Sequence, residues 1–486
     1  MRTKQSILLA VVCIAVLLLT LGVPTAAARG TSGLATANAL SHTIVVKPNG
    51  HDDTADLQAA FNTCTSHGWT CTIQLAKGTY YSYQVTTFGF QGSFVGAGPG
   101  ATIVQAQPNL PSPAPEYNTT TSSYWNALPG ASNPWPAVFT FVGGSYQVSG
   151  MTLSEPYSVP SLGFYDDGVS YDSLPGIIIV TGTQASAHFD HVTVLGASGD
   201  FAGYNLQDAI FFAGLTLVPG GSTVAGLLPL SGSLSVTNSA FFTVDTGPGT
   251  WNLLNADLTV CFDNVVNSAV PFAIFDTYGS VVTLCGNRAS DVEFGAGVLM
   301  WQGYQVTSQV PTTLYVLGND FQVSDGSNGV LLLDFTNSVN AVVSGNLIQT
   351  DTSCGCYLSD EPDALGYSAI SVVGAASALV SKNVIIGGGA AGVYFTGGPG
   401  AVSGNVILGT VVGVWADYAS GISIVGNVIQ NSGQWGIAVT DGSSSIVVSH
   451  NFVKNSAQFD LYWDGSGTGN VWSHNSCQTS SPSGLC

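Results

Sequence analysis

Seven copies of a short phrase centred on asparagine run through the second half of this chain of 486 residues. A recurring period of 20–50 residues is typical of repeat architectures. Each phrase alternates polar and apolar residues, and glycines fall near each half period, as in GGGAAGVYF. We therefore predict one turn of a β solenoid per repeat. The seven residues are Asn319, Asn346, Asn383, Asn405, Asn427, Asn451 and Asn475.

The repeat extends upstream more weakly. Asn238, Asn264 and Asn287 follow at steps of 26 and 23 residues, and SGMTL at 149–153 resembles one more copy. His191 in FDHVTV takes the position that Asn264 takes in FDNVV. Asn side chains at one corner of stacked coils can form a ladder of hydrogen-bonded amides. We expect these residues to be structural.

The charge balance restricts the partners. The chain has 28 acidic and 8 basic residues, a net charge of −20, and beyond residue 80 its basic residues are Arg288, Lys382 and Lys454. Because no basic patch can neutralise phosphates, nucleic acid and anionic membranes are disfavoured as partners.

The N-terminus has the pattern of a secretory signal peptide. Arg2 and Lys4 precede an apolar run at 7–23, and Ala26-Ala27-Ala28 offers a cleavage site. An uncleaved anchor is the alternative, given the length of the run. We predict a signal peptide at 1–28, a flexible segment at 29–42, and a single secreted domain at 43–486 without membrane contact.

Cysteines support an extracellular location. Eight remain when Cys13, inside the apolar run, is set aside, and an even number in a secreted chain predicts disulfides. Cys354 and Cys356 would form a tight bridge, which we favour over a metal pair because no His lies nearby at ligand spacing. Spacing suggests three other pairs: Cys64 with Cys71, Cys261 with Cys285, and Cys477 with Cys486.

A helix is expected at about 53–64, after the N-cap sequence Asp52-Asp53-Thr54. It would cover the open end of the strand stack and prevent pairing with other chains. Its apolar face would carry Leu57, Ala60, Phe61 and Cys64.

The order HDDTADLQAAFNTC, TIQLAKGTYY and GSFVGAGPGATIVQ, followed by the Asn coils, resembles the pectate lyase superfamily. Gly78-Thr79-Tyr80 matches, whereas Ala76-Lys77 replaces the usual Pro-containing turn. The resemblance covers nearly the whole mature chain. It implies an all-β, right-handed parallel β-helix with an N-terminal helical cap. It implies no single activity, because the superfamily includes lyases, hydrolases, epimerases and tailspikes.

Long insertions follow several Asn positions and carry aromatic and acidic residues. If they share one corner, they line a groove suited to an extracellular polysaccharide. The insertions lie at 107–136, 154–176, 195–208, 243–257 and 351–366. We predict Tyr165, Tyr204 and Trp251 as stacking platforms for sugar rings.

Glycoside hydrolysis needs two carboxyl groups. Asp167 or Asp172 is predicted as one and Asp208 as the other, in stretches similar to N-x-D-G-I and D-D segments of superfamily glycosidases. Ordinary turn chemistry is the alternative interpretation of these Asp residues. The G-H-G turn and R-I-K triplet of the polygalacturonase-like family are absent from the sequence, which argues against galacturonan as the substrate.

Two other functions stay open. FDHV is similar to the W-I-D-H stretch of pectate lyases, but with so few basic residues a lyase would need metal to hold a polyuronate. The acidic stretch Asp351, Asp360, Glu361 and Asp363 is a Ca²⁺ candidate; otherwise no cofactor is expected. A non-catalytic secreted structural or glycan-adhering protein is the third interpretation.

Overall fold

Short parallel strands form almost all of the described structure, as the alternating sequence predicts. The computed structural model describes residues 42–82, 85–106, 138–154, 177–182, 184–196, 210–213, 232–242, 249–268, 270–292, 296–302, 310–324, 327–350, 367–387 and 389–486. The unit Ser41–Cys486 contains two parallel sheets, called sheet A and sheet B here. The predicted signal peptide lies outside the described residues.

Sheet A has 26 strands in two columns that meet at a corner. The first column comprises β1 His42–Val46, β2 Thr70–Leu75, β5 Gln91–Val95, β12 Gly232–Thr237, β15 Ala256–Cys261, β18 Val281–Cys285, β21 Thr312–Leu317, β24 Val339–Ser344, β27 Ser377–Ser381, β30 Gly400–Ser403, β33 Ile422–Val425, β36 Val447–Ser449 and β39 Val471–Ser473. The second column comprises β3 Gly78–Ser82, β6 Thr102–Ala106, β13 Ala240–Phe242, β16 Asn264–Ser268, β19 Arg288–Val292, β22 Asp320–Val323, β25 Leu347–Thr350, β28 Val384–Ile386, β31 Val406–Leu408, β34 Val428–Gln430 and β37 Phe452–Lys454. Two long strands run through both columns, β8 Ser145–Ser154 and β10 Ser186–Leu195.

Sheet B has 14 strands, each paired with its equivalent in the next coil. They are β4 Val85–Phe88, β7 Phe139–Val142, β9 Ile178–Thr181, β11 Ile210–Ala213, β14 Gly249–Leu254, β17 Phe272–Tyr278, β20 Ala296–Gln302, β23 Asn328–Asp334, β26 Ile370–Val373, β29 Ala391–Gly397, β32 Val412–Ala419, β35 Trp435–Thr440, β38 Phe459–Trp463 and β40 Ser480–Ser481.

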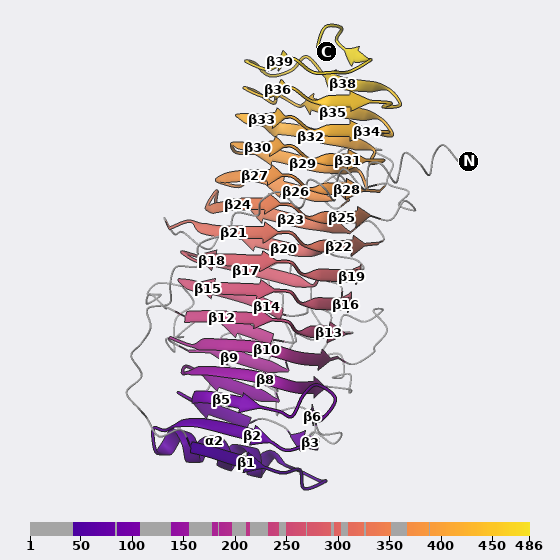
Figure 1. Ribbon diagram of the computed structural model, residues 1–486. Coiled ribbons are helices and arrows are strands. Elements are labelled where there is room, and N and C mark those ends of the chain that lie inside the picture. Colours follow the sequence, from indigo (N-terminus) through magenta and orange to yellow (C-terminus); the bar gives the residue numbers. More distant parts are fainter. Residues whose placement is uncertain are drawn as a thin grey trace, which may run out of the picture. The chain divides into compact units, whose positions relative to one another are not determined.

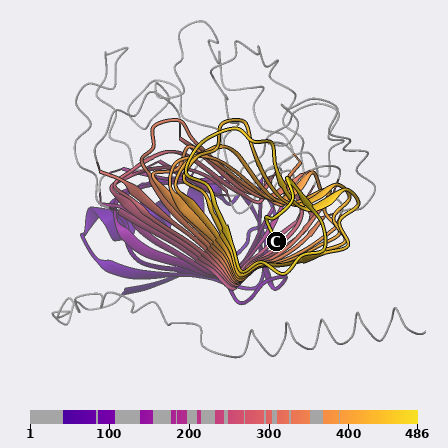
Figure 2. The same cartoon turned by 90° about the horizontal axis from the view of Figure 1, so that it is seen from above.

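Each coil passes from the first column to the second and then to sheet B, and the coils stack along one axis (Figure 1, Figure 2). The inward side chains are mostly Val, Ile, Leu and Phe, and they form one continuous core. The chain is therefore a right-handed parallel β-helix, which confirms the predicted fold class.

The amide ladder is confirmed at the corner between the two columns. From Ser239 onwards, each backbone N–H donates to the side-chain oxygen of the equivalent residue in the next coil, at 2.6–3.1 Å. The residue before each ladder position has positive φ, as at Gly318 (63°) and Gly345 (70°), and glycine adopts this conformation without steric cost.

Three upstream assignments are wrong in register. Strand pairing aligns Thr193 with Ala240, and Ala240 with Asn264. His191 and Asn238 therefore occupy the left-handed corner position, each with φ of 52°. The ladder positions belong to Ser239, the residue after Asn238, and to Asp263, the residue before Asn264, whereas Asn264 begins β16. A slip of one residue would turn the core side chains outward, so the inward apolar residues determine the register.

The predicted helix is α2, Thr54–Ser66, and its four predicted apolar residues are its buried ones. Phe61 contacts four Phe rings of the first coils. Asp53 does not cap the helix with its side chain. Instead its carboxylate accepts hydrogen bonds from the N–H groups of Asn49 (2.8 Å) and Tyr81 (3.0 Å), which ties the helix start to β3.

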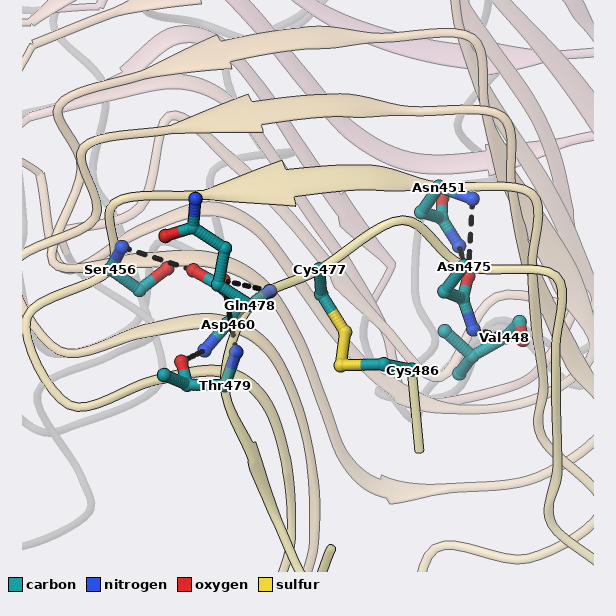
Figure 3. Close-up of a disulfide and its surroundings, with 9 residues drawn as sticks. All are labelled: Val448, Asn451, Ser456, Asp460, Asn475, Cys477, Gln478, Thr479 and Cys486. Carbon is teal, nitrogen blue, oxygen red and sulfur yellow. Dashed lines mark hydrogen bonds between the residues drawn. A yellow bond between two sulfur atoms is a disulfide. The ribbon is translucent and has the colours of Figure 1, made fainter. Parts of the chain in front are cut away.

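Three of the predicted disulfides are present. Cys64–Cys71 joins α2 to β2, and Cys261–Cys285 joins adjacent coils. Cys477–Cys486 closes the last coil (Figure 3), where Asp460 accepts hydrogen bonds from the N–H groups of Ser456 and Gln478. Cys354 and Cys356 lie outside the described residues.

Candidate functional site

Most of the predicted site residues cannot be placed. Asp167, Asp172, Asp208, Tyr165 and Tyr204 lie outside the described residues, as does the Ca²⁺ candidate stretch. The segments 107–137, 155–176, 197–209 and 351–366 each connect a second-column strand to the next strand of sheet B.

The prediction for Trp251 is wrong. The stretch predicted as an insertion contains strand β14, in which Trp251 and Leu253 face the core, and the Trp251 side chain is 0% exposed. A ring that stacks on a sugar needs an open face, so Trp251 cannot be a stacking platform. Its ring packs in the hydrophobic core. Its position inside a period-two strand explains the burial.

A second cluster of aromatic side chains, separate from the continuous core, lies on strands β29 to β38 of sheet B. Tyr394 and Trp415 are 5% and 7% exposed, whereas Trp435 and Tyr462 are partly exposed. Strand pairing brings Tyr394 of β29 beside Trp415 of β32, and Ala438 of β35 beside Tyr462 of β38. The residues that alternate with them, such as Val414 and Val439, point into the core. We call Tyr394, Trp415, Trp435 and Tyr462 the aromatic strip.

Ring packing makes the strip continuous across four strands. Tyr394 meets Trp415 edge-on at 5.5 Å between ring centroids, and Trp415 meets Trp435 in the same way at 6.4 Å. Trp435 stacks on Tyr462 at 4.4 Å with the rings 5° from parallel. Ala438 is a buried member of the same cluster, and Trp435 packs against this cluster. Such pairs stabilise one another and hold the rings in fixed positions.

A β-bulge lies beside the strip. Between β29 and β32 the register shifts so that Phe395 pairs with Ala416 but Gly397 pairs with Ala419. The extra residue leaves Asp417 and Tyr418 opposite a single residue of β29. Tyr418 has φ of 46° and is 64% exposed. Bulges of this kind occur next to active sites, where they redirect a side chain.

Asp417 is the centre of a hydrogen-bond network. The Tyr394 hydroxyl donates to Asp417 Oδ2 at 2.9 Å, and the Thr440 hydroxyl donates to Oδ1 at 3.0 Å. The Trp415 indole N–H donates to Thr440 Oγ1 at 2.9 Å. Asp417 is 8% exposed, and these hydrogen bonds join its carboxyl group to Tyr394 and, through Thr440, to Trp415 of the aromatic strip.

The environment of Asp417 favours its protonated form. Burial and, after it, the hydrogen-bonded Asp441 carboxyl raise the pKa of Asp417 to about 6, although the Tyr394 and Thr440 hydroxyls act to lower it. Burial and the nearby Asp417 charge also raise the pKa of Tyr394, which keeps its hydroxyl a donor. A carboxyl group with a pKa near neutrality can donate or accept a proton during catalysis.

Asp464 has the opposite environment. Pairing of Asp417 with Thr440, and of Val439 with Trp463, places Asp464 in the same row, one strand beyond Thr440. Burial acts to raise the pKa of Asp464, but hydrogen bonds from Ser466 and from the Asp441 N–H (2.8 Å) outweigh burial and lower the pKa. We call Asp417, Asp441 and Asp464 the acid row.

Among the described residues of sheet B, no Lys or Arg offsets these acids. Arg288, Lys382 and Lys454 belong to the strands or corners of sheet A. In the sequence, the insertions between the strands contain neither Lys nor Arg. Within the described ranges, no group of three or more His, Cys, Asp or Glu side chains could hold a metal ion. Across the same residues, no helix is long and apolar enough to span a membrane.

The sequence analysis missed this site, although a signal was present. The phrases GVYFTG, GVWADY and GIAVTD align in the three strands that carry Tyr394, Trp415 and Ala438. At one aligned position two of the phrases have Thr, whereas the third has Asp417. This Asp is the departure from the repeat. The glycines of these phrases indicate tight bends, and the repeat pattern alone assigns no role to the residues after them.

Comparison with family models supports the fold. Residues 296–477 match the family described as "Right handed beta helix region". No curated protein matches the sequence significantly.

Solved structures resemble the chain only distantly. The catalytic unit of a GH87 α-1,3-glucanase from Streptomyces thermodiastaticus is 12% identical with a TM-score of 0.43, over 92% of this chain and 71% of that one. The A-module of mannuronan C-5 epimerase AlgE6 from Azotobacter vinelandii is 15% identical with a TM-score of 0.34, over 88% and 93%. PfbA, a surface adhesin of Streptococcus pneumoniae, is 13% identical with a TM-score of 0.36, over 89% and 93%. Likeness at this level transfers no activity.

Proposed function

We propose that the chain binds an uncharged extracellular polysaccharide along the aromatic strip and hydrolyses it with the acid row. One observation carries the proposal. Asp417 and Asp464 lie in one row on the same face, and their environments move their pKa values in opposite directions. Two carboxyl groups whose pKa values are shifted in opposite directions correspond to the acid and the base of a glycoside hydrolase.

The spacing between the two strands is close to the upper end of the carboxyl separation found in inverting hydrolases. Two strand steps separate β32 from β38, which is about 9.6 Å at about 4.8 Å per step. Inverting hydrolases hold their carboxyl groups about 6.5–9.5 Å apart, so that a water molecule fits between one of them and the sugar. In this assignment protonated Asp417 donates to the leaving oxygen, and ionised Asp464 activates the water.

Asp441 is proposed as the residue that links the two. Its backbone N–H donates to Asp464, and its carboxyl group shares a hydrogen bond with Asp417. The negative charge of Asp441 keeps the proton on Asp417, because two carboxylates at hydrogen-bonding distance resist joint ionisation.

Charge decides the substrate class. A polyuronate brings one carboxylate per sugar, and sheet B offers an acid row without Lys or Arg among its described residues. Repulsion would oppose binding, whereas an uncharged glycan can contact the partly exposed Trp435 and Tyr462 and the exposed Tyr418, and can donate hydroxyl hydrogens to carboxylates. A polyuronate lyase is therefore the less suitable alternative, and the glycan-adhering protein without catalysis is the second one.

The loop carboxylates remain a separate candidate pair. Asp208 belongs to the connection that leads into β11, and β32 is the seventh strand after β11 in sheet B. At about 4.8 Å per strand the two strands are about 34 Å apart, too far for one scissile bond. Asp167 or Asp172 with Asp208, together with Tyr165 and Tyr204, would form a second, independent site.

Secretion is part of the proposal. Three disulfides and the signal-peptide pattern of residues 1–28 are consistent with an oxidising compartment outside the cytoplasm.

The experiment is a hydrolysis and binding screen of neutral glucans, mannans and xylans beside polyuronates. Asp417→Asn and Asp464→Asn are compared with wild type, and Asp257→Asn, on the exposed face of sheet A, is the matched control. We expect each acid-row variant to lose at least about 100-fold in kcat on the neutral substrate while retaining binding, because acid–base groups contribute about 10²–10⁴-fold.

Equal turnover in all four proteins would contradict the assignment of the acid row. Loss of turnover in Asp208→Asn alone would move the site to the loop carboxylates. Binding without turnover by the wild type would support the adhesive alternative.

A further inference from the structure

The amide ladder contains one carboxyl group among its amides. Asp263 occupies the ladder position between Ser239 and Asn287, and the eight later positions from Asn287 to Asn475 are all Asn. Its side chain lies in the corner of the core, and the residue is 2% exposed. A buried carboxylate without a counter-ion is costly, so this position needs a physical explanation.

In the neighbouring coils, the second polar atom of each ladder side chain has a fixed hydrogen-bond partner. The Nδ2 atom of each ladder Asn donates to the carbonyl three residues before the preceding ladder position: Asn287 to Val260 (2.8 Å), and Asn319 to Leu284 (3.1 Å). In Asp263 the equivalent atom is Oδ2, and the equivalent carbonyl is that of Val236. Asp263 Oδ2 is buried and has no hydrogen-bond partner within the described residues.

We propose that Asp263 is a proton-binding site of the folded chain, whose Oδ2–H takes the place of the Asn Nδ2–H in the ladder and is lost in alkali. A protonated carboxyl group has one acceptor and one donor, which matches the two directions of the ladder. Its Oδ1 accepts from the Ser239 N–H at 2.6 Å, and its Oδ2–H donates towards the Val236 carbonyl. An ionised carboxylate would place Asp263 Oδ2 against the Val236 carbonyl oxygen, with no hydrogen between them.

The charges around Asp263 favour the proton. Burial raises the pKa of Asp263 to about 8, the Ser239 N–H opposes this, and the Asp190 charge adds to it. Asp190, on β10, is hydrogen-bonded to the exposed His191 at 2.7 Å. On the other side of the corner, Arg288 extends into solvent and lies 3.9 Å from Asp320. No cation therefore contacts Asp263 within the described residues.

The contribution of Asp263 to folding stability should decrease as the pH rises. An unfolded Asp has a pKa of about 3.9, so the folded chain holds one extra proton between about pH 4 and pH 8. The stabilisation by Asp263 is complete below pH 4, decreases as the pH rises towards 8, and is constant above it. The coils joined at Asp263 are therefore most stable in acid, and the corner is a pH-sensitive element of the fold.

The test compares thermal unfolding of wild type and Asp263→Asn from pH 4 to pH 9. We expect the midpoints to agree near pH 4 and the variant to unfold several degrees higher at pH 8.5, because its amide needs no proton. Asn346→Asp, the reverse exchange at a regular ladder position, should unfold progressively earlier than wild type as the pH rises.

Parallel curves for wild type and Asp263→Asn across this range would overturn the proposal, whatever their offset. If the Asp263→Asn variant does not fold, infrared spectra of the chain with Asp263 intact decide. An Asp417→Asn background removes the other Asp among the described residues whose pKa is raised. In this background the folded chain at pH 7 should show the carbonyl band of a protonated carboxylic acid, and absence of that band would exclude a protonated Asp263.

Discussion

The corner of sheet A and the outer face of sheet B are built by the same coils but differ in regularity. At the corner, Asn383, Asn405 and Asn427 repeat one side chain and one set of hydrogen bonds from coil to coil. On sheet B the equivalent positions hold Tyr394, Trp415 and Ala438, and each makes different contacts. Repetition stabilises the stack, whereas the departures from it form a surface that can recognise a ligand.

The two regions also differ in what their side chains contact. Ladder side chains satisfy buried backbone groups, so their loss should affect folding first. Acid-row and strip side chains lie on the outer face beside a bulge, so their loss should affect binding and chemistry first. Three predictions test this division, and they are ordered by the size of the expected effect.

Asn427→Ala should lower the free energy of unfolding by about 3–5 kcal/mol. Asn427 donates Nδ2 to the Val402 carbonyl and accepts from Asn405 N–H and Nδ2, so alanine leaves several buried groups unpaired. Each such group costs about 1–3 kcal/mol. Denaturant unfolding measures the change. Asn431→Gly, four residues away at an exposed left-handed corner, is the control and should change stability by less than about 0.5 kcal/mol. Similar losses in both variants would remove the special role of the ladder.

Tyr394→Phe should shift the alkaline limb of the pH–rate profile to higher pH by about one unit. The hydroxyl donates to Asp417 and lowers its pKa, so removal raises the pKa and keeps the acid form to higher pH. A hydrogen bond to a charged group is worth about 1.5 kcal/mol, and one pH unit corresponds to about 1.4 kcal/mol. Tyr315→Phe, on the outer face of sheet A, should leave the profile unchanged. A shift to lower pH would contradict the proposed network.

Tyr418→Ala should weaken binding of a neutral oligosaccharide about fivefold, which is roughly 1 kcal/mol for one aromatic contact. Because Tyr418 is 64% exposed, stability should change little. Calorimetric titration and thermal unfolding of the same preparation measure both quantities. Unchanged affinity with lost stability would place Tyr418 with the structural residues.

The fold could be predicted because its determinants repeat. Periodic Asn and alternating apolar residues specify the coil, and the cap helix follows from the spacing of Leu57, Ala60 and Phe61. The upstream register was harder to predict, because Ser239 and Asp263 replace Asn there and misleading Asn residues lie one position away.

The site was harder to predict because it depends on single departures from the repeat. Nothing local in the sequence marks Asp417 as buried, since its environment comes from Tyr394 and Thr440 in the neighbouring coils. Trp251 shows the opposite error. Surrounding Gly and Pro residues suggest a loop, but alternation with Leu253 places the indole in the core.

Hydrogen–deuterium exchange with and without a neutral oligosaccharide that the wild type binds tests the central claim most directly. The account predicts added protection in peptides that contain β29, β32, β35 and β38, and little change at the ladder corner of sheet A. Protection confined to sheet A, or to the segments around Asp167 and Asp208, would contradict a binding surface formed by the aromatic strip and the acid row.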